Sequence, residues 1–150
     1  MNPNPTNNRQ YPILPVPAVA GLIFSESNSI VLIQRGTPPA QGKWSLPGGV
    51  ITLGEKPEEA LKREIDEECG IQIQIESILT VVSRIIRDRT GRIQYHYIIT
   101  DFICQYLSGD LTPGSDARDG GWFQPHQLES VDLTKGLMEV IETGLAKKST

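Results

Sequence analysis

The sequence is poor in the features that mark several classes of protein. Its two cysteines, Cys69 and Cys104, show neither the paired spacing of a metal-binding motif nor a disulfide framework. No apolar run approaches the roughly 20 residues that span a bilayer. Residues 1–10 lack the charged region and apolar block of a signal peptide. We therefore expect free thiols, no membrane segment and a cytoplasmic protein.

The sequence also lacks an excess of positive charge. Lys and Arg total 14 against 18 Asp and Glu, so the formal net charge is -4. Nucleic-acid-binding surfaces usually need a basic stripe, and this balance argues against a nucleic-acid partner. It does not exclude a small phosphorylated ligand, because a few local cations or a bound metal ion reverse the local field.

The length of 150 residues suits one domain with a buried core. Residues 1–15 are rich in proline and asparagine, and we expect a flexible arm there. Deleting residues 1–10 should then leave folding and catalysis nearly unchanged. We expect residues 16–150 to form a single domain.

Strand and helix patterns alternate within that domain. β-rich runs and helical segments are separated by turn residues, and we expect a polar loop over residues 113–121. The expected strands lie at 16–24, 30–33, 71–86 and 92–107, and the expected helices at 57–69 and 134–145. Strands flanked by two helices in one domain predict an α/β fold with a mixed sheet between the helices.

Three glutamates, Glu64, Glu67 and Glu68, share one face of the helix predicted at 57–69. Their spacings of three and four residues place the side chains about 5–6 Å apart. Three like charges repel one another, and Mg²⁺ offsets that cost because it prefers oxygen ligands and is shared between carboxylates and phosphates. From the helix alone, a metal site and a solvated acidic face are equally good interpretations.

The segment before this helix favours the metal site. Gly48 and Gly49 follow Pro47 and permit a tight turn, in which a main-chain carbonyl oxygen can reach the same metal ion. Glu55 and Arg63 lie on either side of the helix start, as an opposite-charge pair placed to tie the loop to the helix.

Together these residues resemble the Nudix box, G-x5-E-x7-R-E-U-x-E-E-x-G-U, where U is a bulky aliphatic residue. Gly49, Glu55 and the run from Arg63 to Ile71 match it at all nine defined positions, across 23 residues. Chance agreement over so many positions is far rarer than for a lone glycine motif. The resemblance implies the Nudix fold, an α/β/α sandwich with a mixed β-sheet between helices.

The resemblance also implies a role for each residue of the pattern. The ligands of Mg²⁺, or of Mn²⁺ in its place, would be Glu64, Glu67, Glu68 and the main-chain carbonyl of Gly48. Glu55 and Arg63 would be structural partners rather than ligands.

Hydrolysis needs a general base for the attacking water, and this base varies within the family. It is either a box glutamate, for which Glu64 and Glu67 are the candidates, or an acid on a loop outside the box. Asp116 and Asp119 precede Trp122, and the resemblance favours Asp116. The alternative is that both aspartates only form the turn.

Two arginines are candidates for binding the anionic substrate. Arg35 ends the second predicted strand, and Arg84 belongs to a basic patch around a turn. Ordinary surface charge explains Arg35 almost as well. For the patch, which consists of Arg84, Arg87, Arg89 and Arg92, solvated turn charges are the commoner explanation.

The pattern from Pro38 to Gly49 and the pair Asp116-Ala117 are similar to those of small bacterial ADP-ribose pyrophosphatase-like proteins of this family. The resemblance implies Mg²⁺-dependent hydrolysis of a phosphoanhydride in a nucleoside diphosphate derivative, first ADP-ribose to AMP and ribose 5-phosphate. One alternative is a sanitising pyrophosphatase for nucleoside triphosphates such as an oxidised dGTP. Another is a catalytically silent nucleotide-sensing domain, although such domains often lose box glutamates and this chain has lost none. The sequence does not decide between a monomer and a homodimer.

Overall fold

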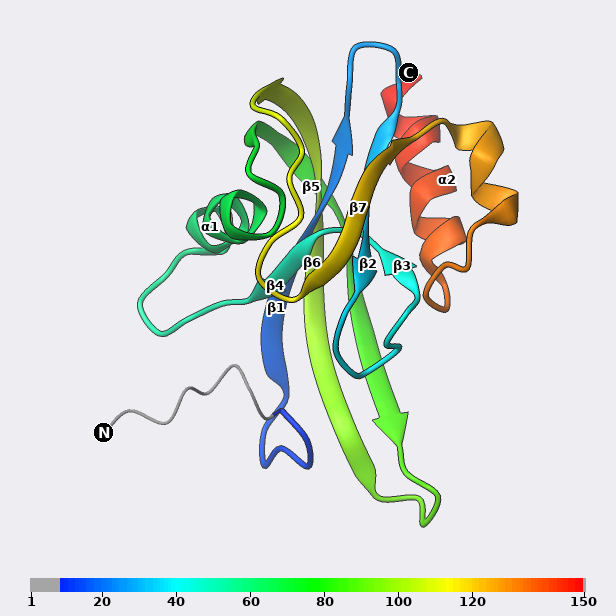
Figure 1. The fold of residues 1–150 in the computed structure, drawn as a ribbon. Coiled ribbons are helices and arrows are strands. Elements are labelled where there is room, and N and C mark those ends of the chain that lie inside the picture. Colours follow the sequence, from blue (N-terminus) through cyan, green and yellow to red (C-terminus); the bar gives the residue numbers. More distant parts are fainter. Residues whose placement is uncertain (1–8, 150) are drawn as a thin grey trace.

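The computed structural model describes residues 9–149, in which a mixed sheet lies between two helices (Figure 1). The strands are β1 (Val16–Phe24), β2 (Ile30–Arg35), β3 (Trp44–Ser45), β4 (Gly48–Val50), β5 (Gln72–Arg87), β6 (Ile93–Ser108) and β7 (Ala117–Phe123). The helices are α1 (Pro57–Cys69), the short 3-10 helix η1 (Pro125–Ser130) and α2 (Leu137–Lys148). This is the α/β architecture that the sequence predicts.

The sheet has the strand order β3-β2-β1-β6-β5, with β4 paired to β1 and β7 paired to β2. Strands β1 and β6 are parallel, and the other pairs are antiparallel. Strand β1 has two neighbours on one side: Ala18–Ala20 pair with β4, and Phe24 pairs with Ile30 of β2. This division places the two glycines of β4 in the middle of the sheet.

Each face of the sheet has its own apolar core. Because side chains alternate along a strand, Val19 and Ile23 of β1 pack towards α1, while Leu22 and Phe24 pack towards α2. Both cysteines are free and buried, as predicted, in the core beneath α1. The helix that carries the glutamates is therefore anchored on one face of the sheet.

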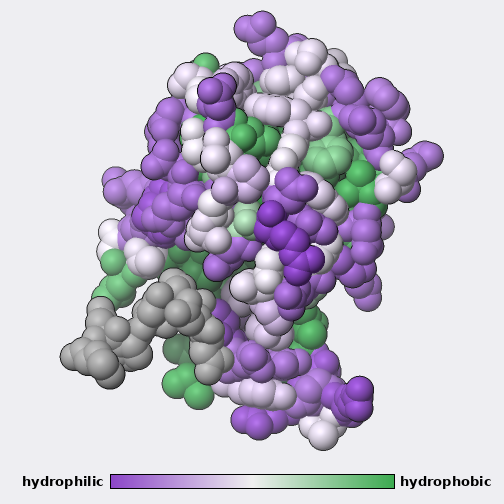
Figure 2. Space-filling model, in the orientation of Figure 1, coloured by the Kyte–Doolittle hydropathy of each residue, from purple (hydrophilic) through white to green (hydrophobic). Residues whose placement is uncertain are grey.

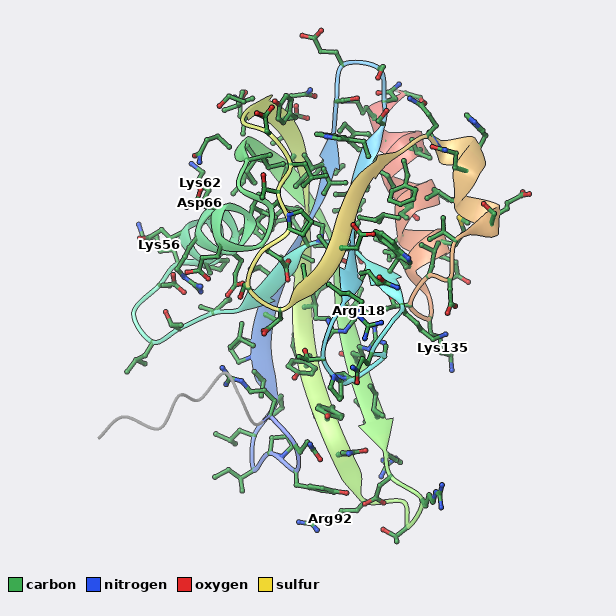
Figure 3. The ribbon with its side chains drawn as sticks, in the orientation of Figure 1. Lys56, Lys62, Asp66, Arg92, Arg118 and Lys135 are labelled. Carbon is green, nitrogen blue, oxygen red and sulfur yellow. The ribbon has the colours of Figure 1, made fainter. Side chains whose placement is uncertain are left out.

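Helix α1 begins and ends at the predicted residues. Pro57 occupies the first turn, and Gly70 adopts the left-handed conformation with φ 70°, its N–H donating to the carbonyls of Ile65 and Asp66. The side chain of Lys56 makes no capping bond, and the Glu59 carboxylate accepts the Lys56 N–H instead, at 3.2 Å. Figure 3 shows Lys56, Lys62 and Asp66 on the side of α1 that faces away from the sheet.

Strand boundaries elsewhere differ from the prediction by at most two residues, and two segments differ more. The loop predicted over 113–121 ends early, because Ala117 to Phe123 pair with β2 as strand β7. Its glycines have little strand propensity of their own, and pairing overrides that local preference. The second predicted helix, at 134–145, begins instead at Leu137 and runs to Lys148, because Gly136 adopts a left-handed φ of 82°.

Strands β5 and β6 form a long hairpin that extends beyond both helices (Figure 1). Tyr11 contacts its tip: the Tyr11 N–H donates to the Gln94 carbonyl at 2.7 Å, and its hydroxyl donates to Asp88 at 2.7 Å. The Arg92 guanidinium lies 4.1 Å from the centre of the Tyr11 ring. The described part of the predicted arm, residues 9–15, therefore contacts the domain, and residues 1–8 lie outside the description.

Polar side chains prevail over the face drawn in Figure 2, with apolar patches between them. The most exposed large apolar side chains are Ile13 and Leu53. Among the described residues, no helix combines the length and apolar content needed to cross a membrane.

Asp101 of β6 places a carboxyl group in the interior, and the residue is 5% exposed. It pairs with Ala20 of β1 on one side and with Thr80 of β5 on the other. Burial raises its pKa to about 7. Between pH 4 and pH 7 the unfolded chain therefore binds fewer protons than the folded one, and stability falls as pH rises.

Asp101→Asn should remove this pH dependence, because the amide resembles the neutral acid. Between pH 5 and pH 8, the free energy of unfolding of the variant should fall by about 2–3 kcal/mol less than that of the wild type. Denaturant unfolding at both pH values measures this, with the exposed Asp110→Asn as the matched control. Parallel profiles for Asp101→Asn and the wild type would contradict the assignment.

Candidate active site

Glu68 is the most buried of the three glutamates on α1. The residue is 7% exposed, and its Oε1 accepts the N–H of Gly48 at 2.9 Å. The pKa of Glu68 is raised to about 8, chiefly by burial and also by the charges of Glu64 and Asp116, while the Gly48 hydrogen bond and Arg35 oppose the shift. The charged carboxylate is thus poorly solvated, and a bound cation would stabilise it.

Glu64 lies one turn earlier on the same face, beneath Gly49. A Cβ atom at position 49 would overlap the Glu64 carboxylate, so glycine lets the carboxylate lie here without being displaced. Burial is the largest cause that raises the pKa of Glu64, and the charges of Glu67 and Asp116 raise it as well. The hydrogen bond from Arg63 and the positive charge of Arg63 lower it. Gly49 therefore forms a cradle for a second carboxylate.

Glu67 is the most exposed of the three, with 49% of its side chain accessible, and its Oε2 accepts from Arg63 at 3.2 Å. Arg63 also donates to Glu64, at 2.8 Å. Within residues 9–149, no three acidic, histidine or cysteine side chains converge in the geometry of a metal site. Glu64 and Glu67 are bound to Arg63, and Glu68 is bound to Gly48.

The chemistry of these side chains nevertheless fits a hard divalent cation. All three offer carboxylate oxygens, the ligands that Mg²⁺ and Mn²⁺ prefer. Glu68 is buried, Glu64 is partly buried, and the charge of Glu64 acts on Glu68, so a cation would relieve both the burial cost and the repulsion. The donor set therefore suits the ion that the sequence resemblance implies.

Arg63 ties the loop to the helix. Its Nε and Nη2 donate to the two oxygens of Glu55, at 2.6 Å and 2.9 Å, and Nη2 also donates to the Val50 carbonyl at 3.1 Å. The Thr52 N–H donates to Glu55 as well, at 2.9 Å. These bonds, with Arg63 the largest cause, lower the pKa of Glu55 to about 2. Arg63 thereby connects the end of β4 to the glutamate face of α1.

Arg63→Ala should reduce stability and activity together. It removes a two-pronged ion pair and leaves Glu55 and the Val50 carbonyl without their partner. Because the Arg63 side chain is 31% exposed, we expect a loss of about 1–2 kcal/mol rather than the full value of a buried pair. Thermal unfolding measures this, with the exposed neighbour Lys62→Ala as control. An unchanged melting temperature with lost activity would instead indicate a direct contact with substrate.

The two loop aspartates occupy different surroundings. The charge of Asp116 acts on both Glu64 and Glu68, raising the pKa of each. Asp119 lies within β7, and its carboxylate accepts the N–H of Gly120 at 2.8 Å. The fold therefore brings Asp116, and not Asp119, towards the glutamates, although its role as the base stays a prediction.

The charge of Arg35 acts on Glu68 of α1 and also on Arg84 and Tyr97 of the β5–β6 hairpin. Its charge lowers the pKa of Glu68 and also that of Tyr97, and its Nε donates to the Pro39 carbonyl at 2.6 Å. Arg84 of β5 pairs directly with Tyr97 of β6. Burial lowers the pKa of Arg84, and the charge of Arg35 lowers it further. The two predicted substrate-binding arginines therefore lie near enough for the charge of Arg35 to act on Arg84.

The rest of the predicted basic patch lies elsewhere. Arg87 donates to the Gly91 carbonyl in the hairpin turn, at 2.9 Å, and Arg92 stacks on the Tyr11 ring. Figure 3 shows Arg92 at the far tip of the hairpin. Only Arg84 of this patch is close to Arg35.

Two buried polar groups were not predicted from the sequence: the Nε of Arg9, which has no hydrogen-bond partner among the described residues, and the carboxyl group of Asp101. The alternation of Tyr95, Tyr97 and Asp101 along one strand places them on one face, and the rings of Tyr95 and Tyr97 stack at 6.3 Å. That alternation was a usable signal for Asp101. Arg9 had none, because it precedes the first strand in a segment without periodicity.

Comparison with known proteins identifies a family and relatives of this chain. The NUDIX domain family description matches residues 14–143. An ADP-ribose pyrophosphatase of Methanocaldococcus jannaschii is 40% identical over 114 residues, which cover 76% of this chain and 64% of the relative. A nucleoside triphosphatase, NudI, of Salmonella paratyphi B is 38% identical over 104 residues, covering 66% of this chain and 72% of that protein.

A solved structure supports the fold. The MutT protein of Methanosarcina mazei Go1 superposes with a TM-score of 0.75 at 22% identity, covering 93% of this chain and 99% of that one. This likeness concerns the fold alone. The matched part of this chain spans less than two thirds of the length of the archaeal ADP-ribose pyrophosphatase.

Proposed function

This chain belongs to the NUDIX domain family, and from that premise we propose that it is a metal-dependent pyrophosphohydrolase. Its substrate would be a nucleoside diphosphate derivative, cleaved at a phosphoanhydride bond. The observation that carries the proposal is the complete set of Glu64, Glu67 and Glu68 on one face of α1, beside Gly48 and Gly49 of strand β4.

Glu64, Glu67, Glu68 and the Gly48 carbonyl would hold Mg²⁺ or Mn²⁺. When bound, such an ion neutralises phosphate oxygens and favours deprotonation of the attacking water. The exposed position of Glu67 keeps this side of the cluster open to a substrate.

The chain's own residues would perform the remaining tasks. Asp116 takes the proton of the attacking water, because its carboxylate lies on the glutamate side and is exposed. If the general base instead lies within the Nudix box, Glu64 or Glu67 takes this role. Arg35 and Arg84 bind phosphate oxygens, and Arg63 with Glu55 holds the loop in place.

ADP-ribose is the first substrate we propose, with AMP and ribose 5-phosphate as products. Its support is the 40% identical relative named an ADP-ribose pyrophosphatase. The second candidate is a nucleoside triphosphate such as an oxidised dGTP, supported by the 38% identical nucleoside triphosphatase. A catalytically silent nucleotide sensor is the alternative from another class. A cytoplasmic location, the absence of a nucleic-acid partner and the choice between monomer and homodimer stay predictions.

A substrate panel tests this proposal. The purified protein with Mg²⁺ is incubated with ADP-ribose, other nucleotide sugars, dinucleotides and nucleoside triphosphates, including oxidised dGTP, and the products are separated by ion exchange. We expect AMP and ribose 5-phosphate in equal amounts from ADP-ribose. Release of pyrophosphate from a triphosphate at a higher kcat/KM would select the second candidate. Binding without turnover of any compound, with Mg²⁺ or Mn²⁺, would favour the sensor.

A further inference from the structure

Three arginines from separate segments lie near enough to Tyr97 for their charges to act on it: Arg9 before β1, Arg35 at the end of β2 and Arg84 on β5. Arg84 faces Tyr97 across the β5–β6 ladder. The positive charges of Arg9, Arg35 and Arg84 each lower the pKa of the Tyr97 hydroxyl, while its burial raises it. The cationic groups therefore gather at one place on the fold.

These three cations have no carboxylate partner in an ion pair among the described residues. The ion pairs there involve only Lys43 and Arg63. The Nε of Arg9 is buried and has no hydrogen-bond acceptor, the one such side-chain nitrogen or oxygen among residues 9–149. A buried polar atom without a partner destabilises the folded state, and like charges add repulsion. In a chain with a net charge of -4, a cluster of this kind calls for an anionic ligand.

The position of Arg9 follows from neighbouring contacts. Tyr11, two residues later, bonds to the main chain of Gln94 and to the Asp88 side chain, and it carries the Arg92 guanidinium on its ring. These three contacts fix the segment against the β5–β6 hairpin. Arg9 is thus held beside Tyr97 by structure outside the arginine cluster.

Arg35 connects this cluster to the glutamates of α1. Its charge acts on Glu68 on one side and on Arg84 and Tyr97 on the other. A ligand whose phosphoryl groups lie between the glutamates and Tyr97 would therefore lie within reach of the Arg35 charge.

We propose that Arg9, together with Arg35 and Arg84, binds a phosphoryl group of the nucleoside diphosphate substrate, so that the segment before β1 forms one wall of the binding site. The inference rests on the proposed function and assigns to it a residue outside the Nudix box. It also replaces the expectation that deleting residues 1–10 leaves catalysis nearly unchanged. That deletion removes Arg9 and should therefore weaken substrate binding.

Arg9→Ala tests the inference through kinetics and direct binding. Loss of a charge-assisted hydrogen bond should raise KM about 10- to 100-fold and leave kcat within about twofold. Arg9→Lys, which keeps the charge, should recover part of the loss. The matched control is Arg89→Ala, an exposed arginine in the hairpin turn, which should behave as wild type.

Equilibrium binding of ADP, measured by titration calorimetry in the presence of EDTA, separates this inference from the proposed function. Arg9→Ala should raise the Kd for ADP about 10-fold relative to Arg89→Ala, whether or not the wild type turns over any substrate. Equal Kd values for the two variants, both folded by thermal unfolding, would overturn the role of Arg9. Absence of wild-type turnover would overturn the proposed function alone.

Discussion

Replacing Glu68 with glutamine should lower turnover at saturating Mg²⁺ by about 10³-fold, because a charged metal ligand supplies several kcal/mol of transition-state stabilisation. The metal-free fold should remain as stable as wild type, or become more stable. Glu68 is 7% exposed, and burial with the charges of Glu64 and Asp116 raises its pKa to about 8. The amide oxygen still accepts the Gly48 N–H, so the main hydrogen bond survives.

The pH dependence of this effect has a definite sign. Because the folded pKa of Glu68 lies above the usual value, the metal-free wild type loses stability as pH rises from about 4.5 towards 8. Glu68→Gln has no such loss, so its relative stability should grow over that range. Glu67→Gln should also lower turnover by orders of magnitude, with a smaller effect on stability, since its side chain is half exposed.

Turnover at saturating Mg²⁺ measures the effect on catalysis, and thermal unfolding in EDTA measures the effect on the stability of the metal-free protein. Glu58→Gln is the control, because Glu58 lies in the first turn of the same helix and is exposed. If Glu68→Gln or Glu67→Gln kept near wild-type turnover, the metal-ligand assignment would be wrong.

Replacing Asp116 with asparagine should lower kcat by roughly 10²–10⁴-fold, the usual range for a general base. KM should change little, because the amide keeps the size and polarity of the side chain. The defect should shrink at high pH, where hydroxide replaces the assisted water. The reason to choose Asp116 is electrostatic: its charge reaches Glu64 and Glu68.

Asp119→Asn is the matched control for this prediction. Asp119 lies three residues further along, and its carboxylate is bonded to the Gly120 N–H, so its replacement should be mild. Two outcomes would remove Asp116 from the mechanism: small and equal effects at both positions, or a loss confined to KM. Either would return the base to the box, with Glu64 as the next residue to test.

Local signals explain why α1 could be predicted to the residue. Pro57 starts the helix and Gly70 ends it through their own backbone preferences, and the spacing of Leu61, Ile65 and Cys69 defines the buried stripe. The same spacing argument placed Glu64, Glu67 and Glu68 on one face. Their unequal burial could not be predicted, because it depends on where the sheet and Gly49 lie relative to the helix.

Non-local contacts explain the parts that the sequence missed. Strand β7 forms because β2 offers it a partner, and nothing within Ala117 to Gly121 indicates that pairing. The difference between Asp116 and Asp119 also appears only when β7 is placed. Arg9 belongs to a segment whose position is decided by Tyr11 and the distant hairpin tip.

The most direct test of the account is the Mg²⁺ dependence of ADP-ribose hydrolysis, measured side by side for wild type and Glu67→Gln. We expect no turnover in EDTA and saturable activation of the wild type by Mg²⁺. AMP and ribose 5-phosphate should appear in equal amounts, and Glu67→Gln should be slower by orders of magnitude at every Mg²⁺ concentration. Wild-type turnover that persists in EDTA, or equal turnover by the two proteins, would contradict the claim that the α1 glutamates bind a catalytic metal ion.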